Sequence, residues 1–330
     1  MGEFDLIARY FTRPVRHAVV GVGDDCALLA PRPGMQLAIS SDMLVEGRHF
    51  FADVDPEALG HKALAVNLSD LAACGARPLA FTLALALPRV DEAWLAGFSR
   101  GLLALADAHG CELVGGDTTQ GPLNLCITVF GEVPAGQALL RSGARAGDDI
   151  YVSGTLGDAR LALEALLGHM TLPPALLEHT RQRLERPTPR VALGLALRGL
   201  ATSAMDVSDG LLGDLVHLLK ASQAGARIEA ETATNLIAAG AHPQSAEAKF
   251  PLNLLRQCAL AGGDDYELLF TAPPRHRAAV AQAGAACSTP VTRIGTVLPT
   301  PGLQVVDAHG APVEQRFASF DHFASAPSDR

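Results

Sequence analysis

Short apolar runs bounded by Gly, Pro or Asp alternate with longer stretches of helical periodicity along most of this chain. This alternation is typical of mixed α/β proteins. The apolar runs predict strands at 37–40, 81–87, 112–114, 125–133, 150–153, 204–207, 267–271 and 291–297. The periodic stretches predict helices at 56–74, 91–109, 158–167, 174–186, 190–198, 211–221 and 275–283. The expected fold class is therefore α/β (α+β), with mixed sheets flanked by helices.

A chain of 330 residues is long for one hydrophobic core and sufficient for two domains. Hydrophobic residues make up 48% of it, which is enough apolar material for both cores. Residues 134–149 are rich in Gly, Ala and Arg and precede a new strand, so we place a domain boundary near residue 140. The predicted domains are 1–140 and 141–330, and a second loose region, 230–251, is expected to cap or line the C-terminal domain.

The formal net charge of −9 argues against a nucleic-acid-binding surface, because such a surface needs clustered positive charge. The most apolar stretch, 78–88, is much shorter than a membrane span, and the N-terminus is acidic where a signal peptide is basic. The six cysteines include no C-x-x-C pair, a pattern typical of free thiols in a reducing compartment. These features predict a cytoplasmic protein that binds neither nucleic acid nor membrane.

Acidic residues recur beside glycine or near the ends of predicted elements. The seven segments with this pattern are Gly23-Asp24-Asp25, Ser41-Asp42, Ser69-Asp70, Gly115-Gly116-Asp117, Gly157-Asp158, Asp206-Val207-Ser208-Asp209-Gly210 and Gly262-Gly263-Asp264-Asp265. Mg²⁺ takes oxygen ligands such as carboxylates, and glycine lets the main chain approach a phosphate closely. Any one of these segments alone is more often an ordinary turn or a helix N-cap. Together they predict an enzyme that uses divalent metal ions and handles phosphate groups.

The positions of these carboxylates along the predicted elements differ. Asp24 and Asp25 precede the apolar run 26–29, which predicts a strand with two carboxylates at its start. Asp42 follows another apolar run, at a strand exit where ligands collect in α/β folds. Asp70 lies inside a predicted helix, on the same face as Lys62. It is either an exposed surface carboxylate or forms, with Asn67, a polar spot that needs a metal ion or a partner.

The strongest local signal is the pair Asp206 and Asp209. Residues 205–207 are typical of a buried strand end, and Leu211 opens a predicted helix. The free N–H groups of that helix terminus can bind phosphate while the neighbouring carboxylates hold an ion. An N-cap formed by Ser208 or Asp209 would explain part of this pattern but not Asp206.

Several common nucleotide-binding motifs are absent from the sequence. It contains no G-x-x-x-x-G-K-[ST] motif, no H-R-D or D-F-G segment, and only three lysines, Lys62, Lys220 and Lys249. If the chain uses ATP, several Mg²⁺ ions on Asp residues, assisted by Arg, must therefore neutralise the phosphates.

Segments from one end of the chain to the other resemble the thiamine-monophosphate kinases, a family in the superfamily of aminoimidazole ribonucleotide synthetase and selenophosphate synthetase. The matching segments are Gly2-Glu3-Phe4-Asp5-Leu6-Ile7, Gly23-Asp24-Asp25-Cys26-Ala27, Ser41-Asp42, Gly47-Arg48-His49-Phe50, 62–70, Gly115-Gly116-Asp117-Thr118-Thr119, Arg141-Ser142-Gly143-Ala144, 206–211 and 263–268. The resemblance implies the two-domain fold of aminoimidazole ribonucleotide synthetase and a homodimer formed through the N-terminal domains. It also implies transfer of the γ-phosphoryl group of ATP to thiamine phosphate, giving thiamine diphosphate, with several Mg²⁺ ions.

The resemblance also implies roles for individual residues. The implied metal ligands are Asp25, Ser40, Ser41, Asp42, Asp70, Asp117, Asp206 and Asp209. The implied ATP-binding residues are Gly116, Arg141 and Ser208, and the implied acceptor contacts are His49, Asp264 and Phe320. Three positions depart from the family pattern: Ser41-Asp42-Met43 replaces Thr-Asp-Thr, Asp264 replaces Glu, and Phe320 replaces Tyr or Trp.

Two other functions stay open on the sequence. A sister ATP-dependent synthetase would activate an amide or a selenide instead of phosphorylating a phosphate, and the segment 262–268 with His49-Phe50 favours the kinase over it. A non-catalytic acidic protein would bind Mg²⁺ or Ca²⁺ without a nucleotide, but dispersed Gly-Asp segments differ from a contiguous EF-hand loop. An acceptor phosphate has a second pKa of about 6, so it is itself a nucleophile and a phosphate kinase needs no general base.

Overall fold

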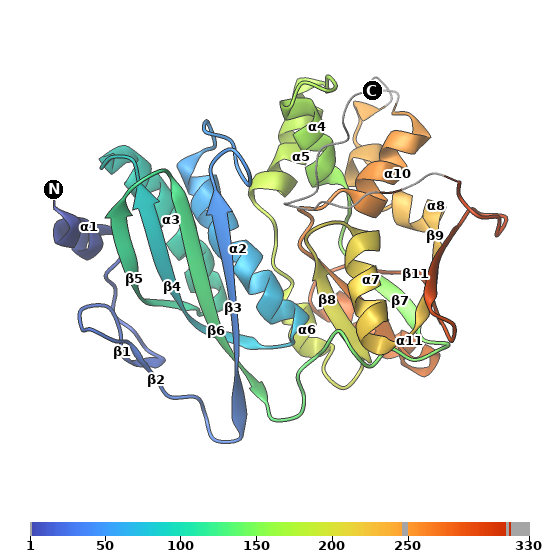
Figure 1. Cartoon of the computed structure of the whole chain (residues 1–330), viewed down its shortest axis with the longest axis horizontal. Helices are drawn as coiled ribbons and strands as arrows, with labels where there is room; N and C mark the ends of the chain where they lie inside the picture. Colours follow the sequence, from blue (N-terminus) through green and yellow to red (C-terminus); the bar gives the residue numbers. More distant parts are fainter. Residues whose placement is uncertain (1, 246–249, 315–316, 318–330) are drawn as a thin grey trace. The chain divides into compact units, whose positions relative to one another are not determined.

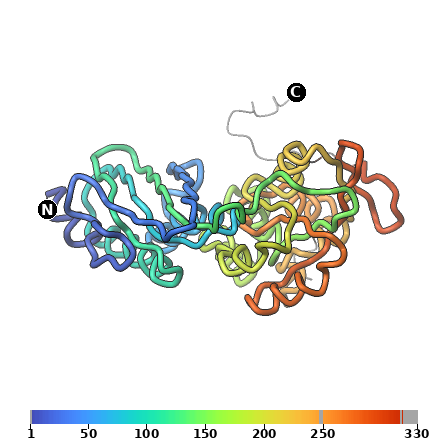
Figure 2. Tube along the Cα trace, turned by 90° about the horizontal axis from the view of Figure 1, so that it is seen from below, coloured from blue at the N-terminus to red at the C-terminus, as the bar shows by residue number. Residues whose placement is uncertain are grey.

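The computed structural model describes residues 2–245, 250–314 and 317. The chain divides into two compact units. Unit 1 contains the described residues up to Leu140 together with Glu185–Ala201 and Ala285–Cys287, and unit 2 contains Arg141–Leu184, Thr202–Gly284 and the described residues from Ser288 onward. Figure 2 follows the trace from the blue and cyan tube of unit 1 to the yellow and red tube of unit 2. Both units combine a sheet with flanking helices, which confirms the predicted fold class.

Unit 1 is built on a four-stranded sheet with the strand order β3-β6-β4-β5. Its strands are β3 (Met35–Val45), β6 (Asn124–Pro134), β4 (Arg77–Leu87) and β5 (Glu112–Gln120). β6 runs antiparallel to both β3 and β4, whereas β4 and β5 are parallel. The helices α2 (Pro56–Ala73) and α3 (Glu92–His109) cover one face of this sheet (Figure 1).

The two covering helices each begin after an aspartate N-cap and pack closely on each other. The Asp55 carboxylate accepts a hydrogen bond from the Glu57 amide at the start of α2, and the Asp91 carboxylate accepts two at the start of α3. Gly101 of α3 lies against α2, where an added Cβ would overlap the carbonyl oxygen of Glu57. Most side chains of α2 are buried, so its polar residues lie in an apolar environment.

The remaining elements of unit 1 are short. They are α1 (Glu3–Tyr10), β1 (Ala18–Val20), β2 (Leu28–Leu29) and α6 (Val191–Ala196). α6 matches the predicted helix at 190–198 and packs on α2, where Gly194 lies against the carbonyl of Ala72. β2 lies within the apolar run 26–29, where the sequence predicts a strand. α1 and β1 were not predicted, because elements of this length carry too little periodicity to identify.

Unit 2 is built on a six-stranded sheet with the strand order β12-β9-β11-β7-β10-β8. Its strands are β12 (Gly302–Val306), β9 (Gly225–Glu229), β11 (Val291–Leu298), β7 (Asp149–Ser153), β10 (Glu267–Ala272) and β8 (Ser203–Val207). All neighbours in it are antiparallel except β12 and β9. The helices are α4 (Asp158–Leu166), α5 (Pro174–Glu185), α7 (Leu211–Ser222), α8 (Ala230–Thr234), α10 (Leu252–Ala261) and α11 (Arg277–Ala286), with 3-10 turns at Ala238–Ala241 and Pro274–His276. α7 packs on β8 (Figure 1) and contributes Leu211, Leu215 and Leu218 to the core.

Three differences from the sequence prediction bear on the site. β3 and β5 extend well beyond the predicted 37–40 and 112–114, so Ser41 and Asp42 lie within a strand and not at its exit, and Gly115-Gly116-Asp117 also lies within one. The loose region 230–251 contains α8 and a 3-10 turn. β9, β12 and α10 were not predicted. Over the described residues, no helix is long and apolar enough to cross a membrane.

Candidate functional site

Two predicted metal ligands of unit 1 meet on the face of β3 that is turned toward α2. The Ser40 hydroxyl donates to Oδ2 of Asp70 at 2.5 Å, and the Asp42 amide donates to Oδ1 of Asn67 at 3.0 Å. Asn67 is 1% exposed and also donates to the carbonyl of Ala63. The expected polar spot on α2 therefore has its partners on β3. Asp70 is partly buried, so its interpretation as an exposed surface carboxylate is wrong.

Ser41 lies on the opposite face of the same strand. Side chains alternate along a strand, so the hydroxyl of Ser41 is directed away from Ser40 and Asp42. It lies 2.9 Å from the Thr128 hydroxyl and donates to the carbonyl of Ile127 on β6. A metal contact from Ser41 beside Asp42 would accordingly use its main-chain oxygen.

Asp25, Gly116 and Asp117 line one cavity of unit 1, which has a volume of about 620 Å³. Asp25 reaches it from the loop after Gly23, and Gly116 and Asp117 lie on β5 beside Leu83 and Ala84 of β4. Gly116 has φ of 143°, and an added Cβ would overlap the carbonyl oxygen of Leu83. Only glycine fits this position, which leaves bare main chain facing the cavity between two carboxylates.

His49 is held in a tight turn between β3 and α2. Its Nδ1 accepts a hydrogen bond from the Val45 amide at 3.0 Å, so the ring proton of the neutral imidazole is on Nε2. The ammonium group of Lys62 donates to the His49 carbonyl at 3.3 Å, and Lys62 is 3% exposed. The sequence places Lys62 on the same helical face as Asp70 but does not indicate this contact to His49.

In unit 2, the segment after β8 carries Asp206, Ser208 and Asp209. Asp206 is the last residue but one of the strand and is 6% exposed, as the sequence predicts for a buried strand end. The N-cap of α7 is Gly210, with φ of 116°, so the alternative of a side-chain cap by Ser208 or Asp209 is wrong. Oδ2 of Asp214 instead accepts hydrogen bonds from the amides of Ser208 and Asp209 at 3.0 and 3.1 Å.

The carboxyl group of Asp214 is 3% exposed. Burial, followed by the nearby charge of Asp209, raises the pKa of Asp214 to about 7. The sequence does not distinguish this residue, because an Asp in the first turn of a helix is ordinary. Its position under the 208–209 segment identifies it as the side chain that fixes the shape of that loop.

The predicted acceptor residue Asp264 lies in a strained loop beside this segment. Gly263, Asp264 and Tyr266 have φ of 75°, 60° and 51°, and two of these residues are not glycine. The Asp264 amide donates to the Ser208 carbonyl at 2.8 Å, and the Tyr266 amide donates to the Val207 carbonyl at 2.8 Å. The loop that follows β8 and the loop that precedes β10 are thus joined through their main chains.

A buried carboxyl group lies beneath this strained loop. Asp265 is 2% exposed, and its Oδ1 accepts a hydrogen bond from the Gly157 amide at 2.8 Å. Its Oδ2 has no hydrogen-bond partner among the described residues. Burial raises the pKa of Asp265 well above its usual value. A buried carboxyl group therefore connects the Asp264 loop to the start of α4.

The last two predicted site residues are Arg141 and Phe320. The carbonyl of Arg141 accepts a hydrogen bond from the Ser222 hydroxyl at 3.0 Å, which fixes the main chain of this exposed residue at the start of unit 2. Phe320 lies outside the described residues.

The predicted ligands suit a hard cation. Carboxylate, hydroxyl and carbonyl oxygens are the donors that Mg²⁺ prefers, and the acidic side chains Asp25 and Asp117 line a cavity that also holds bare main chain. As the side chains stand, no three His, Cys, Asp or Glu residues in the described part of the chain are grouped closely enough to hold a metal ion. The donor chemistry thus fits Mg²⁺, whereas the described side chains do not form a closed cage.

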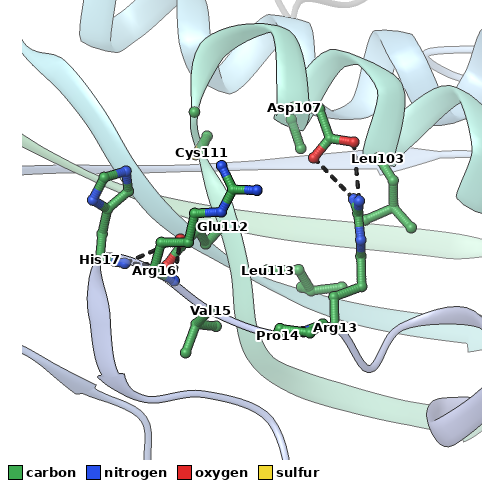
Figure 3. A pocket seen from close by; sticks show the side chains of 12 residues that line it. Arg13, Pro14, Val15, Arg16, His17, Leu103, Asp107, Cys111, Glu112 and Leu113 are labelled. Carbon is green, nitrogen blue, oxygen red and sulfur yellow. Dashed lines mark hydrogen bonds and ion pairs between the residues drawn. The ribbon is translucent and has the colours of Figure 1, made fainter.

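Unit 1 has a second cavity, with a volume of about 290 Å³ (Figure 3). The acidic residues that line it have structural roles. Asp107 forms a two-point ion pair with Arg13, with both distances at 3.0 Å. Glu112 accepts main-chain hydrogen bonds from Arg16, His17 and Ala18. Both acids are satisfied by the chain itself, and none of the predicted site residues lines this cavity.

The sequence matches two family models, the N-terminal domain of AIR synthase related protein over residues 23–133 and its C-terminal domain over residues 145–308. It is 47% identical to the thiamine-monophosphate kinase of Salmonella typhimurium, over 98% of this chain and 99% of that protein. The crystal structure of thiamine-monophosphate kinase from Stenotrophomonas maltophilia is 44% identical, covers 94% of this chain and 96% of its own, and gives a TM-score of 0.81. AaThiL complexed with AMPPCP and TMP is 32% identical, with 89% of each chain covered and a TM-score of 0.74.

Proposed function

We propose that this chain, which belongs to the thiamine-monophosphate kinase family of AIR synthase related proteins, transfers the γ-phosphoryl group of ATP to thiamine phosphate and so forms thiamine diphosphate. The observation that carries the proposal is the likeness to AaThiL, whose solved structure is a complex with the ATP analogue AMPPCP and with TMP. Relatives at 47% identity over nearly the whole chain are kinases of the same kind, which favours this activity over a sister synthetase or a non-catalytic cation-binding protein.

The reaction joins two polyanions, so charge neutralisation and positioning are the main catalytic tasks. The proposed ligands for several Mg²⁺ ions are Asp25, Ser40, Ser41, Asp42, Asp70, Asp117, Asp206 and Asp209. Such ions would neutralise the phosphate oxygens and supply Lewis-acid stabilisation of the transition state. Two hydrogen bonds support this assignment by orienting the ligands: Ser40 holds the Asp70 carboxylate, and Asn67 holds the main chain at Asp42.

The nucleotide phosphates are proposed to contact Gly116, Arg141 and Ser208. Gly116 offers bare main chain to the cavity, and Asp214 fixes the amide positions of the 208–209 segment. His49, Asp264 and Phe320 are proposed to contact the acceptor. The acceptor phosphate is already ionised at neutral pH, so in-line attack needs alignment of the two substrates and no side chain that removes a proton.

A homodimer formed through unit 1 is also proposed. Leu37, Ile39 and Met43 lie on one face of the edge strand β3 and are 43%, 60% and 55% exposed. Exposed apolar side chains that line one face of an edge strand are typical of a surface that a second copy covers. A cytoplasmic location stays a prediction from the sequence.

The test is product analysis with purified protein, ATP, excess Mg²⁺ and thiamine phosphate. We expect thiamine diphosphate and ADP in equal amounts. The same assay with thiamine in place of thiamine phosphate should give no product, because the alcohol lacks the ionised nucleophile. Hydrolysis of ATP without thiamine diphosphate would reject the proposed function.

A further inference from the structure

The cavity shown in Figure 3 is not used by the proposed kinase function. It lies in unit 1 between the segment 13–17, the end of α3 and the start of β5. None of the described residues that are proposed to bind ATP, Mg²⁺ or the acceptor lines it. Its volume of about 290 Å³ is at the lower end of the range for small-molecule sites, so it suits a ligand smaller than a nucleotide.

The acceptor groups that line this cavity are already paired within the chain. Both oxygens of Asp107 accept hydrogen bonds from Arg13, and both oxygens of Glu112 accept hydrogen bonds from main-chain amides. Two carbonyl groups in the last turn of α3 accept hydrogen bonds from the amides of Gly110 and Cys111. A ligand that brought its own N–H or O–H donors would have to compete with these contacts.

The donor groups of the cavity, in contrast, are still available. Arg16 and His17 are exposed, and their side chains form no hydrogen bond or ion pair within the described part of the chain. Figure 3 draws dashed lines to their main-chain nitrogens but none to the Arg16 guanidinium group or the His17 ring. Arg13 uses only part of its N–H donors on Asp107. The lining therefore offers N–H donors, and the Arg16 guanidinium group is permanently charged.

Apolar side chains line the same cavity, namely those of Pro14, Val15, Leu103 and Leu113. Apolar atoms of a ligand that are buried against them would favour binding. A bare inorganic ion would leave these contacts unused. The lining thus favours an anion that is attached to an apolar body.

We propose that this cavity binds a small organic oxyanion, a phosphate or a carboxylate on an apolar body, with Arg16 and His17 in contact with the charged group. A guanidinium group can donate parallel hydrogen bonds to either oxyanion, which an ammonium group cannot. The site is separate from the kinase site, and the proposal does not depend on the kinase function.

The experiment must first fill the kinase site, because a phosphate probe could also bind there. The cavity that contains Asp25 and Asp117 is a neighbour of the proposed site, since Leu113 lines both. The full-length protein is therefore saturated with Mg²⁺, the ATP analogue AMPPCP and thiamine phosphate. Phenyl phosphate, benzoate and inorganic phosphate are then titrated separately, and binding is followed through the amide chemical shifts of isotopically labelled protein.

We expect phenyl phosphate or benzoate to bind with a Kd of about 1 mM or lower and to shift mainly the amides of residues 13–17 and 110–113. Inorganic phosphate should bind severalfold more weakly than phenyl phosphate. Arg16→Gln should weaken binding by about tenfold, the size expected for the loss of one hydrogen-bonded charge. Arg16→Lys should give an intermediate affinity, because it keeps the charge without the planar donor group.

Arg89→Gln is the matched control, because it removes the same charge from a side chain that is 82% exposed and lines neither cavity. It should bind the probe as the wild type does. Equal weakening in Arg89→Gln and Arg16→Gln would reveal only a general attraction of anions and would overturn the proposal. Shifts confined to other residues, or no saturable binding of either organic probe, would also overturn it. Equal affinity for inorganic phosphate and phenyl phosphate would reject the organic ligand.

Discussion

The buried carboxyl group of Asp265 should make the protein less stable as the pH rises. The native state holds the proton of Asp265 to a higher pH than the unfolded chain does, because burial raises the pKa of this carboxyl group well above its usual value, near which the unfolded chain ionises. Between the two pKa values the native state binds the extra proton, so the free energy of unfolding falls by about 1.4 kcal/mol for each pH unit. Below the unfolded-state pKa this stabilisation is complete.

Asp265→Asn removes this dependence while keeping the shape of the side chain. The amide oxygen can still accept the Gly157 hydrogen bond that Oδ1 accepts at 2.8 Å, and the amide nitrogen takes the place of Oδ2, which has no partner among the described residues. We expect the variant to be more stable than wild type at pH about 7 and above, with the difference growing by about 1.4 kcal/mol per pH unit. Urea unfolding followed by circular dichroism between pH about 5 and about 8 measures this difference.

Asp158→Asn is the contrasting variant. Asp158 is also buried, and burial also raises its pKa, but both of its oxygens accept hydrogen bonds, from the amides of Ala238 and Ala239 at 3.0 and 2.8 Å. An Asn side chain there must turn its NH₂ group toward one of these amides, which costs about 1–3 kcal/mol.

Parallel stability curves for wild type and Asp265→Asn would show that Asp265 is ionised in the native protein, and would refute the reasoning.

Four other predictions follow from the site and the packing. Asp206→Asn should lower turnover on the order of 10²-fold with an unchanged circular dichroism spectrum, and near-wild-type turnover would make Asp206 structural. Activity should require free Mg²⁺ beyond one ion per ATP, so full turnover at a one-to-one ratio would contradict a site with several ions. Ile39→Lys should convert the dimer to monomer in light scattering, whereas an unchanged mass would place the interface elsewhere. Gly101→Ala should lower the free energy of unfolding by about 1–3 kcal/mol because its Cβ would overlap the Glu57 carbonyl, and an unchanged Tm would show that α2 and α3 can separate without penalty.

The sequence predicted the elements whose pattern is local. The long helices α2 and α3 agree with the predicted ranges within one or two residues, because each is a long, predominantly apolar stretch that can be recognised locally. Asp206 was correctly placed near a buried strand end, because the short apolar run around it is also a local pattern. The resemblance to a kinase family was also confirmed, since its motifs span the whole chain in order.

What the sequence could not predict depends on pairing between distant segments. The true length of β5 follows from its parallel ladder with β4, which extends pairing through Gly116 and Asp117, although glycine is a weak strand former. The contact between Ser40 and Asp70 needs the register of β3 against α2, and the same register turns the hydroxyl of Ser41 to the other face. A shift of one residue in the register of β3 would exchange the positions of the Ser40 and Ser41 side chains. The spacing of these residues in the sequence therefore could not predict which of them contacts Asp70.

The acidic residues of this chain either hold loops in shape or are proposed to bind ions. Most of the loop-holding residues can be recognised because they are buried and bind main-chain amides. Asp158, Asp214 and Asp265 are buried and bind main-chain amides, so their carboxyl groups hold loops in shape. Asp25 and Asp117 are exposed in a cavity, where oxygen atoms remain accessible to ions. A loop with left-handed residues such as Asp264 persists only when its surroundings over-determine it, and a buried carboxyl group that binds an amide from another element provides that constraint. The excess of acidic residues beside glycine thus reflects both the proposed ion ligands and the groups that hold the ligand-bearing loops in place.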